Sequence, residues 1–458
     1  MNGWWIRRGV WPLMELKGNR IRACMRDMER IERMEPEEIR ALQKDKLRRL
    51  IDHAVRHVPA YRHLREEWER SSAQPGLDPA MFLRERVPVL TKHRFNGDRE
   101  QYVADNAPRE SLIVNRTGGS TGEPTRFYMD RPTVEHYEAA RWRGLGWHGI
   151  RIGDPSVMVW GSPFELSQAQ SRLYTLKERW LKNRILFSAY DLKPERIEEY
   201  VRRIRSFRPH YFYGYVSALA MLAQLLLDRG IRLGVPLKAV ITTAETLHPH
   251  QREAIEKAFG CRAVNEYGAR DAGILAYECP HGGMHISAAN AWLEVVDVKT
   301  HEPLGPGEKG ALVVTDLNNY SQPRLRYLLN DVVSLGADRC PCGRGLPLLA
   351  SIEGREDEIF QTADGTLVHS FYLNQLARGL ASFRRFQLIQ HSPLELTVKL
   401  VRDERFYKPE EEEAFLRGIR EMFGESAQLK VEHVEDIPPS PSGKFRYAIR
   451  EFPLRGKE

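Results

Sequence analysis

The chain opens with a long stretch whose hydrophobic residues recur at helical spacing. Between about residue 16 and residue 70 they fall on one face among many Arg and Glu residues, as at Leu42, Leu47, Leu50, Ile51 and Val55. The pattern predicts a helical region that ends near Pro59, because proline interrupts the hydrogen bonds of a helix.

Two short apolar segments enclose a glycine-rich run. Residues 112–114 and 127–129 have the composition of strands, and residues 117–125 between them read Thr-Gly-Gly-Ser-Thr-Gly-Glu-Pro-Thr. We therefore predict a hairpin that holds this run between two strands.

Helical patterns alternate with short apolar runs from residue 135 to residue 260, for example at 156–160 and 239–243. Such alternation is typical of an α/β sheet. The longest apolar run, 216–227, is too short to span a bilayer and predicts a buried helix.

The pattern changes after residue 286. Apolar runs at 292–296, 311–315 and 331–335 predict an antiparallel β subdomain. Beyond residue 354, strands at 386–389 and 394–398 and a helix at 410–423 predict a small α+β unit. The predicted fold is α/β. A large N-terminal domain covers 1–354, with a helical region at about 1–100, and a small C-terminal domain covers 355–458.

Composition limits the function classes. The 458 residues are 42% hydrophobic and 29% charged, as in a globular protein, and the net charge of +7 is diffuse. That charge suits an anionic substrate such as ATP or a coenzyme thiol and gives no argument for nucleic acid. The chain shows no secretory signal, and its five cysteines do not suggest a disulfide framework, so we expect a cytoplasmic protein without a transmembrane segment.

Tryptophans cluster beside arginines near the start of the sequence. Trp4, Trp5 and Trp11 accompany Arg7 and Arg8. These residues would either rest on a membrane surface or pack as an N-terminal arm, and we expect packing.

The glycine-rich run is a candidate phosphate loop. Glycines expose backbone N–H groups to an anion, and hydroxyls add further donors. A plain hairpin turn is the alternative, and the run lacks the Gly-Lys-Ser/Thr ending of the Walker loop. The candidate residues are Thr117, Gly118, Gly119, Ser120, Thr121, Gly122 and Thr125.

Further polar residues follow predicted strands, where α/β sheets bind ligands. Residues 243–246 (Thr-Ala-Glu-Thr) are candidate nucleotide contacts, unless Thr242 or Thr243 simply caps a helix. In 265–271 (Asn-Glu-Tyr-Gly-Ala-Arg-Asp), an aromatic ring would stack on a base and an acid would hold a cation, with a plain loop as the alternative.

Two single residues complete the set of candidates. Asp331 would accept hydrogen bonds from ribose hydroxyls, or it is a turn residue. Lys444 lies in a tight turn, Ser442-Gly443-Lys444, where spacing alone favours a solvated side chain.

Together these motifs resemble the adenylate-forming superfamily, and in particular its phenylacetate–CoA ligase branch with the CapK-type proteins of polysaccharide gene clusters. The resemblance covers nearly the whole chain, and six weak motifs occur in the order of the family. They include the phosphate loop, Ala244-Glu245, Tyr267-Gly268, Arg326-Tyr327 with Asp331, Gly354-Arg355 with Asp357, and Ser442-Gly443-Lys444.

The resemblance implies a role for each motif. The loop 117–125 would bind the β- and γ-phosphates, Asp331 the ribose, and Arg355 would approach the nucleotide. Asp357 would be the hinge of a mobile C-terminal domain. Lys444 would bridge the attacking carboxylate and the α-phosphate. The adenine would be lined by Ala244, Glu245, Asn265, Glu266 and Tyr267, with Gly268 beside them.

Three positions depart from the family pattern. Gly118 replaces a common serine, Leu328 replaces the usual arginine, and Asp271 stands where a glutamate is thought to hold Mg²⁺. These departures bear on the acceptor and the rate more than on the nucleotide.

Three cysteines and a histidine form a further pattern. Cys279, Cys340 and Cys342 with His285 would satisfy tetrahedral zinc, and His281 is the substitute for His285. Reduced thiols on two turns are the alternative. Similar clusters occur in some members of the branch, which favours a structural zinc site.

The expected function is ATP-dependent activation of a carboxylic acid to its acyl-adenylate with release of pyrophosphate. Transfer to coenzyme A would follow, and Mg²⁺ would neutralise the pyrophosphate. The alternatives are a CapK-like enzyme of polysaccharide biosynthesis with a non-CoA acceptor, or a non-catalytic binding module. A homodimer would fit the branch, and Trp160, Phe164, Tyr213 and Tyr215 hint at an aromatic or apolar acyl group.

Overall fold

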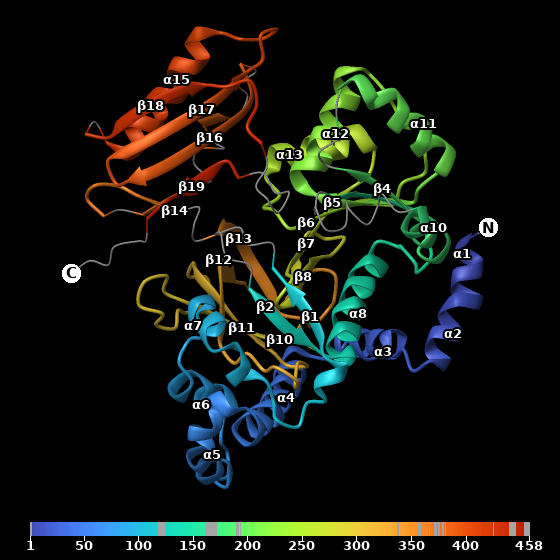
Figure 1. The fold of residues 1–458 in the computed structure, drawn as a ribbon, viewed down its shortest axis with the longest axis vertical. Helices are drawn as coiled ribbons and strands as arrows, with labels where there is room; N and C mark the ends of the chain where they lie inside the picture. Colours follow the sequence, from blue (N-terminus) through green and yellow to red (C-terminus); the bar gives the residue numbers. More distant parts are fainter. Residues whose placement is uncertain are drawn as a thin grey trace.

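A mixed sheet organises most of the chain in this computed structural model (Figure 1). Its order is β10-β11-β12-β13-β9-β8-β7-β6-β5-β3-β4 among the described residues. The structure describes residues 2–117, 125–160, 172–188, 192, 194–336, 339–355, 359–365, 367–370, 373, 376–377, 380, 382–424, 426–438 and 446–452.

One half of this sheet is parallel and matches the predicted α/β alternation. Its strands are β3 (Ser156–Trp160), β4 (Arg184–Ser188), β5 (Tyr211–Tyr215), β6 (Ala239–Thr243) and β7 (Ala263–Ala269). The linking helices are α10 (Arg172–Leu181), η6 (Pro194–Arg196), α11 (Ile197–Phe207), α12 (Val216–Asp228) and α13 (Pro249–Phe259). The apolar run 216–227 is thus a buried helix, as predicted, and no described helix is long and apolar enough to cross a membrane.

The other half is antiparallel and begins where β7 turns back into β8 (Gly273–Glu278). The predicted antiparallel strands are present, and they continue the parallel sheet instead of forming a detached subdomain. They are β9 (Met284–Ile286), β10 (Ala291–Val296), β11 (Gly310–Asp316), β12 (Tyr327–Leu335) and β13 (Leu348–Arg355).

Helices form the first part of the chain. They are α1 (Asn2–Trp5), η1 (Ile6–Val10), α2 (Trp11–Leu16), α3 (Ile21–Ile31), α4 (Pro36–His57), η2 (Pro59–Leu64), α5 (Arg65–Ser72), α6 (Pro79–Arg86), α7 (Lys92–Gly97), η3 (Arg99–Tyr102) and η4 (Arg109–Ser111). A capping box between Glu35 and Glu38 starts α4, and the helix ends before Pro59 as the sequence predicts. Its apolar face, including Leu47 and Leu50, is buried.

The predicted hairpin around the glycine-rich run is present. Strands β1 (Ile113–Arg116) and β2 (Arg126–Met129) pair antiparallel, and α8 (Arg131–Trp147) follows. The hairpin crosses in front of the large sheet in Figure 1.

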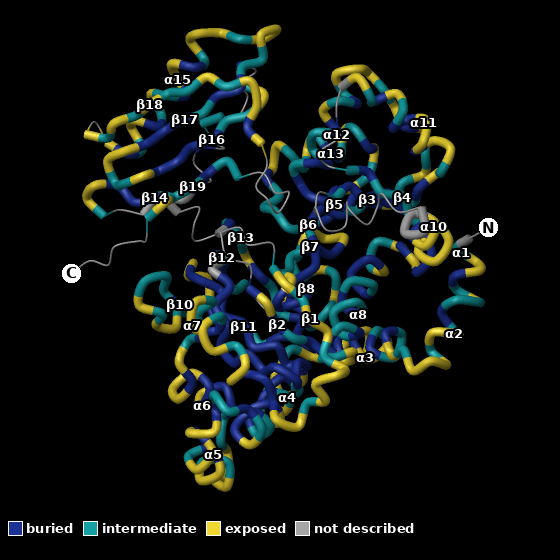
Figure 2. The backbone as a smooth tube through the Cα atoms, in the orientation of Figure 1, coloured by how far each residue is buried: buried dark blue, intermediate teal, exposed yellow. Residues whose placement is uncertain are grey.

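A second, four-stranded sheet has its own core. Its strands, in the order β18-β17-β16-β19, are β16 (Phe383–Ser392), β17 (Glu395–Arg402), β18 (Gln428–His433) and β19 (Ala448–Arg450). Helix α15 (Pro409–Phe423) packs Phe415 and Ile419 against it, and Figure 2 shows the buried interior. A short hairpin, β14 (Ile359–Gln361) with β15 (Leu367–His369), precedes this unit.

Two glycines of α8 provide a test of this packing. A Cβ at Gly144 would lie 2.3 Å from the ring of Tyr277, whereas a Cβ at Gly146 would meet no atom within 4 Å. We expect Gly144→Ala to destabilise the protein by about 1–3 kcal/mol through overpacking. Gly146→Ala, the control, should stabilise it by up to about 1 kcal/mol because alanine favours helix. Urea unfolding measures both, and equal midpoints would contradict the packing of α8 on β8.

Candidate active site and metal cluster

The two ends of the predicted phosphate loop are joined by hydrogen bonds. The N–H of Thr117 donates to the carbonyl of Thr125 at 2.9 Å, and the N–H of Thr125 donates to the Thr117 hydroxyl at 3.0 Å. These bonds extend the β1–β2 ladder by one residue on each strand and hold the two ends of the loop together. The loop residues Gly118, Gly119, Ser120, Thr121 and Gly122 lie outside the described residues.

The loop is connected to Asp271 through a buried tyrosine. The Thr125 hydroxyl hydrogen-bonds with that of Tyr327, which donates to Asp271 Oδ2 at 2.8 Å. Burial raises the pKa of Tyr327, so its hydroxyl stays protonated and remains a donor. Arg324, which the sequence analysis did not single out, donates to the backbone carbonyl of Asp271 at 2.6 Å. A carboxylate predicted from one motif therefore lies beside the loop predicted from another.

The side chains of Tyr267 and Asp331 are also in contact, although β7 and β12 lie in different parts of the sheet. The Tyr267 hydroxyl donates to Asp331 Oδ2 at 2.7 Å. The register of β12 and β13 sets Asp331 opposite Arg355, whose side chain is outside the described part of the chain, as are Asp357 and Lys444. Gly268 allows β7 to approach β8, because a Cβ there would lie 2.4 Å from the carbonyl oxygen of Gly273.

Glu245 binds the start of a neighbouring helix. Its carboxylate accepts hydrogen bonds from the N–H of Ser217 at 2.6 Å and from the Ser217 hydroxyl at 3.0 Å. Ala244 turns the chain sharply, with a left-handed φ of 69°. The alternative of a threonine cap is not realised, since α13 begins at Pro249 and its capping residue is His248.

Glu266 lies in a buried polar pocket. It accepts a hydrogen bond from the Tyr213 hydroxyl at 2.6 Å, and Arg141 Nε lies 3.6 Å from its Oε2. Burial raises the pKa of Glu266, and the Arg141 cation opposes that rise. The sequence contained no signal for Arg141, because this residue lies on α8, far from every motif.

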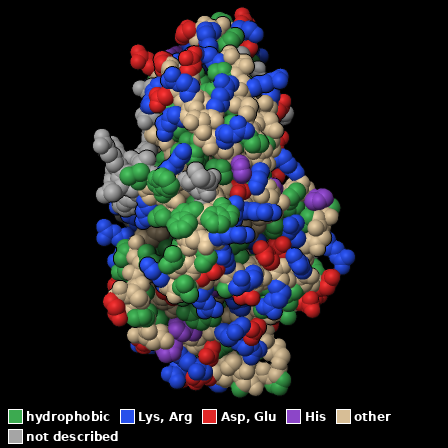
Figure 3. Space-filling model, turned by 90° about the vertical axis from the view of Figure 1, so that its right-hand side faces the viewer, with side chains coloured by type: hydrophobic (Ala, Val, Ile, Leu, Met, Phe, Trp, Pro, Cys, Tyr) green, Lys and Arg blue, Asp and Glu red, His purple; other side chains and the backbone are tan. Residues whose placement is uncertain are grey.

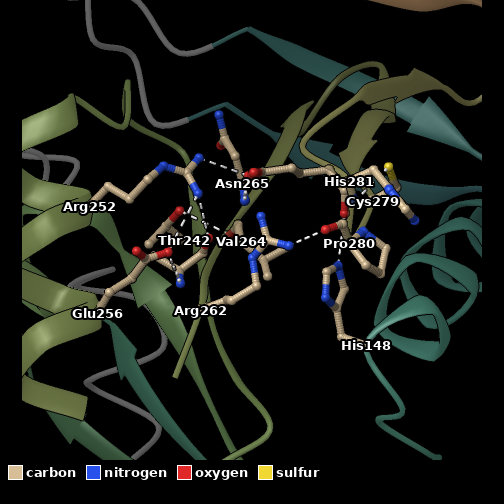
Figure 4. A network of polar contacts seen from close by, with 12 residues as sticks. His148, Thr242, Arg252, Glu256, Arg262, Val264, Asn265, Cys279, Pro280 and His281 are labelled. Atoms are coloured by element: carbon tan, nitrogen blue, oxygen red, sulfur yellow. Dashed lines mark hydrogen bonds and ion pairs between the residues drawn. The ribbon is translucent and has the colours of Figure 1, made fainter. Parts of the chain in front are cut away.

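Asn265 contributes to a network that supports the cysteine turn (Figure 4). Glu278 accepts hydrogen bonds from the Asn265 N–H and from Arg252, both at 2.8 Å. The His148 ring bonds the Glu278 carbonyl at 2.8 Å, and Arg262 donates to the carbonyl of Pro280. Helix α13 and strand β7 are thus tied to the turn that follows Cys279.

The four predicted metal ligands converge. The Sγ atoms of Cys279, Cys340 and Cys342 and a ring nitrogen of His285 all lie within 4.8 Å of one another. Cys279 Sγ is 3.7 Å from Cys340 Sγ, and His285 Nε2 is 3.1 Å from Cys342 Sγ. Cys279 and His285 are buried, and the other two are half-buried.

The surroundings of the cluster suit a metal ligand set. His285 Nδ1 bonds the carbonyl of Leu346 at 3.3 Å, which leaves Nε2 toward the cysteines. Burial lowers the pKa of His285 to about 4, so the ring is neutral. His281 is exposed, and only its backbone N–H reaches Cys279. A Cβ at Gly283 would lie 2.9 Å from Cys340 Sγ, so glycine leaves room for the thiolates.

The residue before β19 contacts the residue before α13. The rings of Tyr447 and His248 pack edge to face with centroids 5.7 Å apart. Tyr447 is three residues beyond Lys444, and His248 is three residues beyond Glu245. The backbone around Tyr447 is anchored to β16 by the Leu388 N–H at 2.8 Å. The sequence analysis did not identify this contact.

Known proteins resemble the chain along most of its length. Residues 360–451 match the CapK C-terminal domain. Protein CapK of Staphylococcus aureus is 25% identical over 376 residues, which cover 80% of each protein. The phenylacetate–coenzyme A ligase of Thermus thermophilus is 28% identical over 72% of this chain and 73% of the ligase. That of Escherichia coli K12 is 24% identical over 93% and 97%.

Solved structures show the same fold. A 2-hydroxyisobutyryl-CoA ligase in its postadenylation state with 2-HIB-AMP superposes with a TM-score of 0.71 at 22% identity, covering 92% of both chains. The same ligase in its thioesterification state covers as much, with a TM-score of 0.57. Sequence motifs, relatives and fold agree: the chain resembles the adenylate-forming superfamily, and its relatives include CapK and the phenylacetate–CoA ligases.

Proposed function

We propose that this protein uses ATP to convert a carboxylic acid into its acyl-adenylate, releases pyrophosphate, and transfers the acyl group to coenzyme A. The observation that carries the proposal is the convergence of Thr125, Tyr267, Asp271 and Asp331 at the β7–β12 boundary, where side chains of β7 and of the turn after it contact β12 although the two strands are not neighbours in the sheet. These residues come from three separate sequence motifs. The relatives named phenylacetate–coenzyme A ligase support the reaction class.

The nucleotide would lie along this boundary. The loop 117–125 would donate backbone N–H groups to the β- and γ-phosphates, and Asp331 would accept hydrogen bonds from the ribose, with Arg355 beside it. Because Glu245 and Glu266 already bind Ser217 and Tyr213, we assign the adenine surface to the backbone near Ala244 and to Tyr267.

Asp271 fits a magnesium site in its chemistry. Its carboxylate is a hard oxygen ligand next to Thr125 at the loop end, where ATP phosphates would lie. A bound Mg²⁺ would neutralise the charge of the departing pyrophosphate. Tyr327 would keep the carboxylate oriented.

Lys444 would supply the cation for the first half-reaction. Adenylation brings a carboxylate against the α-phosphate, and a fixed positive charge between them stabilises the transition state most where water is excluded. The Tyr447–His248 contact supports this role, because it holds the segment after Lys444 near the strand end that carries Ala244. The higher TM-score to the postadenylation state than to the thioesterification state of one ligase agrees with such an arrangement.

The small domain, residues 355–458 by prediction, would then turn about Asp357 to admit coenzyme A.

A CapK-like reaction with a non-CoA acceptor is the second candidate, favoured by the match of residues 360–451 to the CapK C-terminal domain. Release of AMP that depends on coenzyme A supports the first candidate. Carboxylate-dependent ATP–pyrophosphate exchange that coenzyme A does not drive to AMP supports the second.

Replacement of Lys444 tests the adenylation step. We expect Lys444→Ala to lower carboxylate-dependent ATP–pyrophosphate exchange by at least about 100-fold, because the charge between the two anions is lost. Binding of ATP should change little. Lys430→Ala, an exposed lysine of the same domain, is the control and should exchange normally. Normal exchange by Lys444→Ala would refute the mechanism.

Replacement of His248 tests whether the ring contact supports adenylation. His248→Asn removes the ring yet retains a good N-cap for α13, so it separates the contact from helix stability. We expect it to slow pyrophosphate exchange more than transfer from a supplied acyl-adenylate to coenzyme A. His250→Ala, in the neighbouring exposed ring, is the control. An equal loss in both half-reactions would show that the contact does not favour the adenylating arrangement.

We further propose that Cys279, His285, Cys340 and Cys342 bind a structural Zn²⁺ that joins the β8–β9 turn to the loop before β13. Metal analysis should find about one zinc per chain, as in closed four-ligand sites. Cys342→Ser should lose the metal and lower the unfolding midpoint. Cys261→Ser, a solitary thiol, should retain it. Metal-free protein of unchanged stability would contradict the assignment.

A further inference from the structure

An apolar surface remains exposed on the face formed by α1, α2 and α10. Trp4 is 59% exposed, Trp5 52% and Trp180 57%, and further exposed apolar residues are Leu13, Leu16, Leu176 and Leu181. Large apolar side chains gathered on one face mark an interaction site more often than scattered ones do. Trp11, in contrast, is buried, so only part of the first helical segment packs as an arm.

The two helical segments of this surface are fixed to one loop. Arg7 donates to Asp154 at 3.2 Å, and a Cβ at Gly3 would lie 2.8 Å from the carbonyl oxygen of Gly153. Just beyond α10, Asn183 donates to the same Gly153 carbonyl at 2.9 Å. Both segments are therefore anchored to the same loop, and α1 lies beside α10 in Figure 1.

Both segments that carry the exposed apolar residues are rich in basic residues. Residues 172–184 contain five basic residues and one acid, Glu178, which is buried between Lys182 and Arg184. In the first segment the acid Glu15 is paired with Arg22. Figure 3, which views this side of the molecule, shows apolar side chains at mid-height among many Lys and Arg side chains.

The exposed charges stand next to the tryptophans. The Arg8 guanidinium lies over the Trp4 ring, 5.6 Å from its centroid, and Lys177 is exposed on α10. Tryptophan prefers the boundary between lipid headgroups and acyl chains, and nearby cations add attraction to anionic lipid. A symmetric second copy would instead set one basic rim against another, which is repulsive.

We propose that this surface, defined by Trp4, Trp5, Leu13, Leu16, Leu176 and Trp180 with Arg8 and Lys177, docks the protein onto an anionic lipid bilayer. The side chains would enter the headgroup region without crossing the membrane. Docking would bring the enzyme to acids or acceptors held at the membrane surface, and it is independent of the reaction proposed above.

Vesicle sedimentation of the full chain tests the apolar part. The probes are vesicles of phosphatidylcholine alone and of phosphatidylcholine with an equal share of phosphatidylglycerol. We expect the protein to sediment with the anionic vesicles, and the triple change Trp4→Ala, Trp5→Ala and Trp180→Ala to weaken partition at least about tenfold. The control removes other exposed apolar residues far from this surface in the sequence, by Met81→Ala, Leu394→Ala and Phe406→Ala, and should bind normally.

A second variant tests the charge. Arg8→Glu with Lys177→Glu keeps every tryptophan, and its binding to anionic vesicles should fall by at least about tenfold. Added salt should weaken binding of the unchanged protein, because salt screens surface charges. Thermal unfolding of each variant shows whether it is folded. If the triple change impairs folding, the charge variant still tests whether the protein binds anionic vesicles through this surface.

Three outcomes would overturn the proposal. The unchanged protein fails to sediment with anionic vesicles, or the control variant loses binding as much as the triple variant does. In the third outcome, sedimentation velocity without lipid shows an oligomer that the triple change dissociates, in which case a second copy covers this surface.

Discussion

The site depends on the antiparallel pairing of β7 with β8, where the sheet changes from parallel to antiparallel. The strands approach so closely at Gly268 that no other side chain fits against the Gly273 carbonyl. This pairing sets the direction of Tyr267 toward Asp331 and of Asp271 toward Tyr327. Farther along, β8 ends at Glu278, directly before Cys279, so the same hairpin also positions the cysteine cluster.

Buried polar groups stabilise the region in which side chains near β7 contact β12. Tyr327 and Glu266 are buried and hydrogen-bonded to polar partners, because an unpaired buried polar group is costly, and the partly buried Arg141 lies beside the Glu266 carboxylate. The same side chains thus support the fold and orient the groups assigned to the nucleotide. In the described part of the small domain, the Tyr447 ring packs against His248, and this weak contact would have to break in the domain turn proposed above.

Exposed and buried tryptophans of the first helices have different roles. Trp11 packs into the core, whereas Trp4 and Trp5 point outward beside Arg8. An arm that served packing alone would bury the rings in the same way. The division of these residues between core and surface is the reason to assign them an external partner.

The sequence by itself determined the order of helices and strands and the identity of most site motifs. Periodicity located α12, β6 and α15 because these elements are local and strongly patterned. The sequence motifs likewise singled out the three cysteines and His285, whose side chains converge in the structure. Such features are recognised from the types of residue within short stretches of the sequence.

Only the tertiary structure decided which side chains from distant elements come into contact. Arg141, Arg324 and Tyr327 entered the site because helix α8 and strand β12 fold back onto β7, a long-range arrangement with no periodic signal. Long-range packing also places the Glu245 carboxylate where it accepts a hydrogen bond from Ser217, and it brings the Tyr447 ring against His248. The distance in space between residues far apart in sequence is set by the packing of helices and strands. A sequence motif contains no information about that distance.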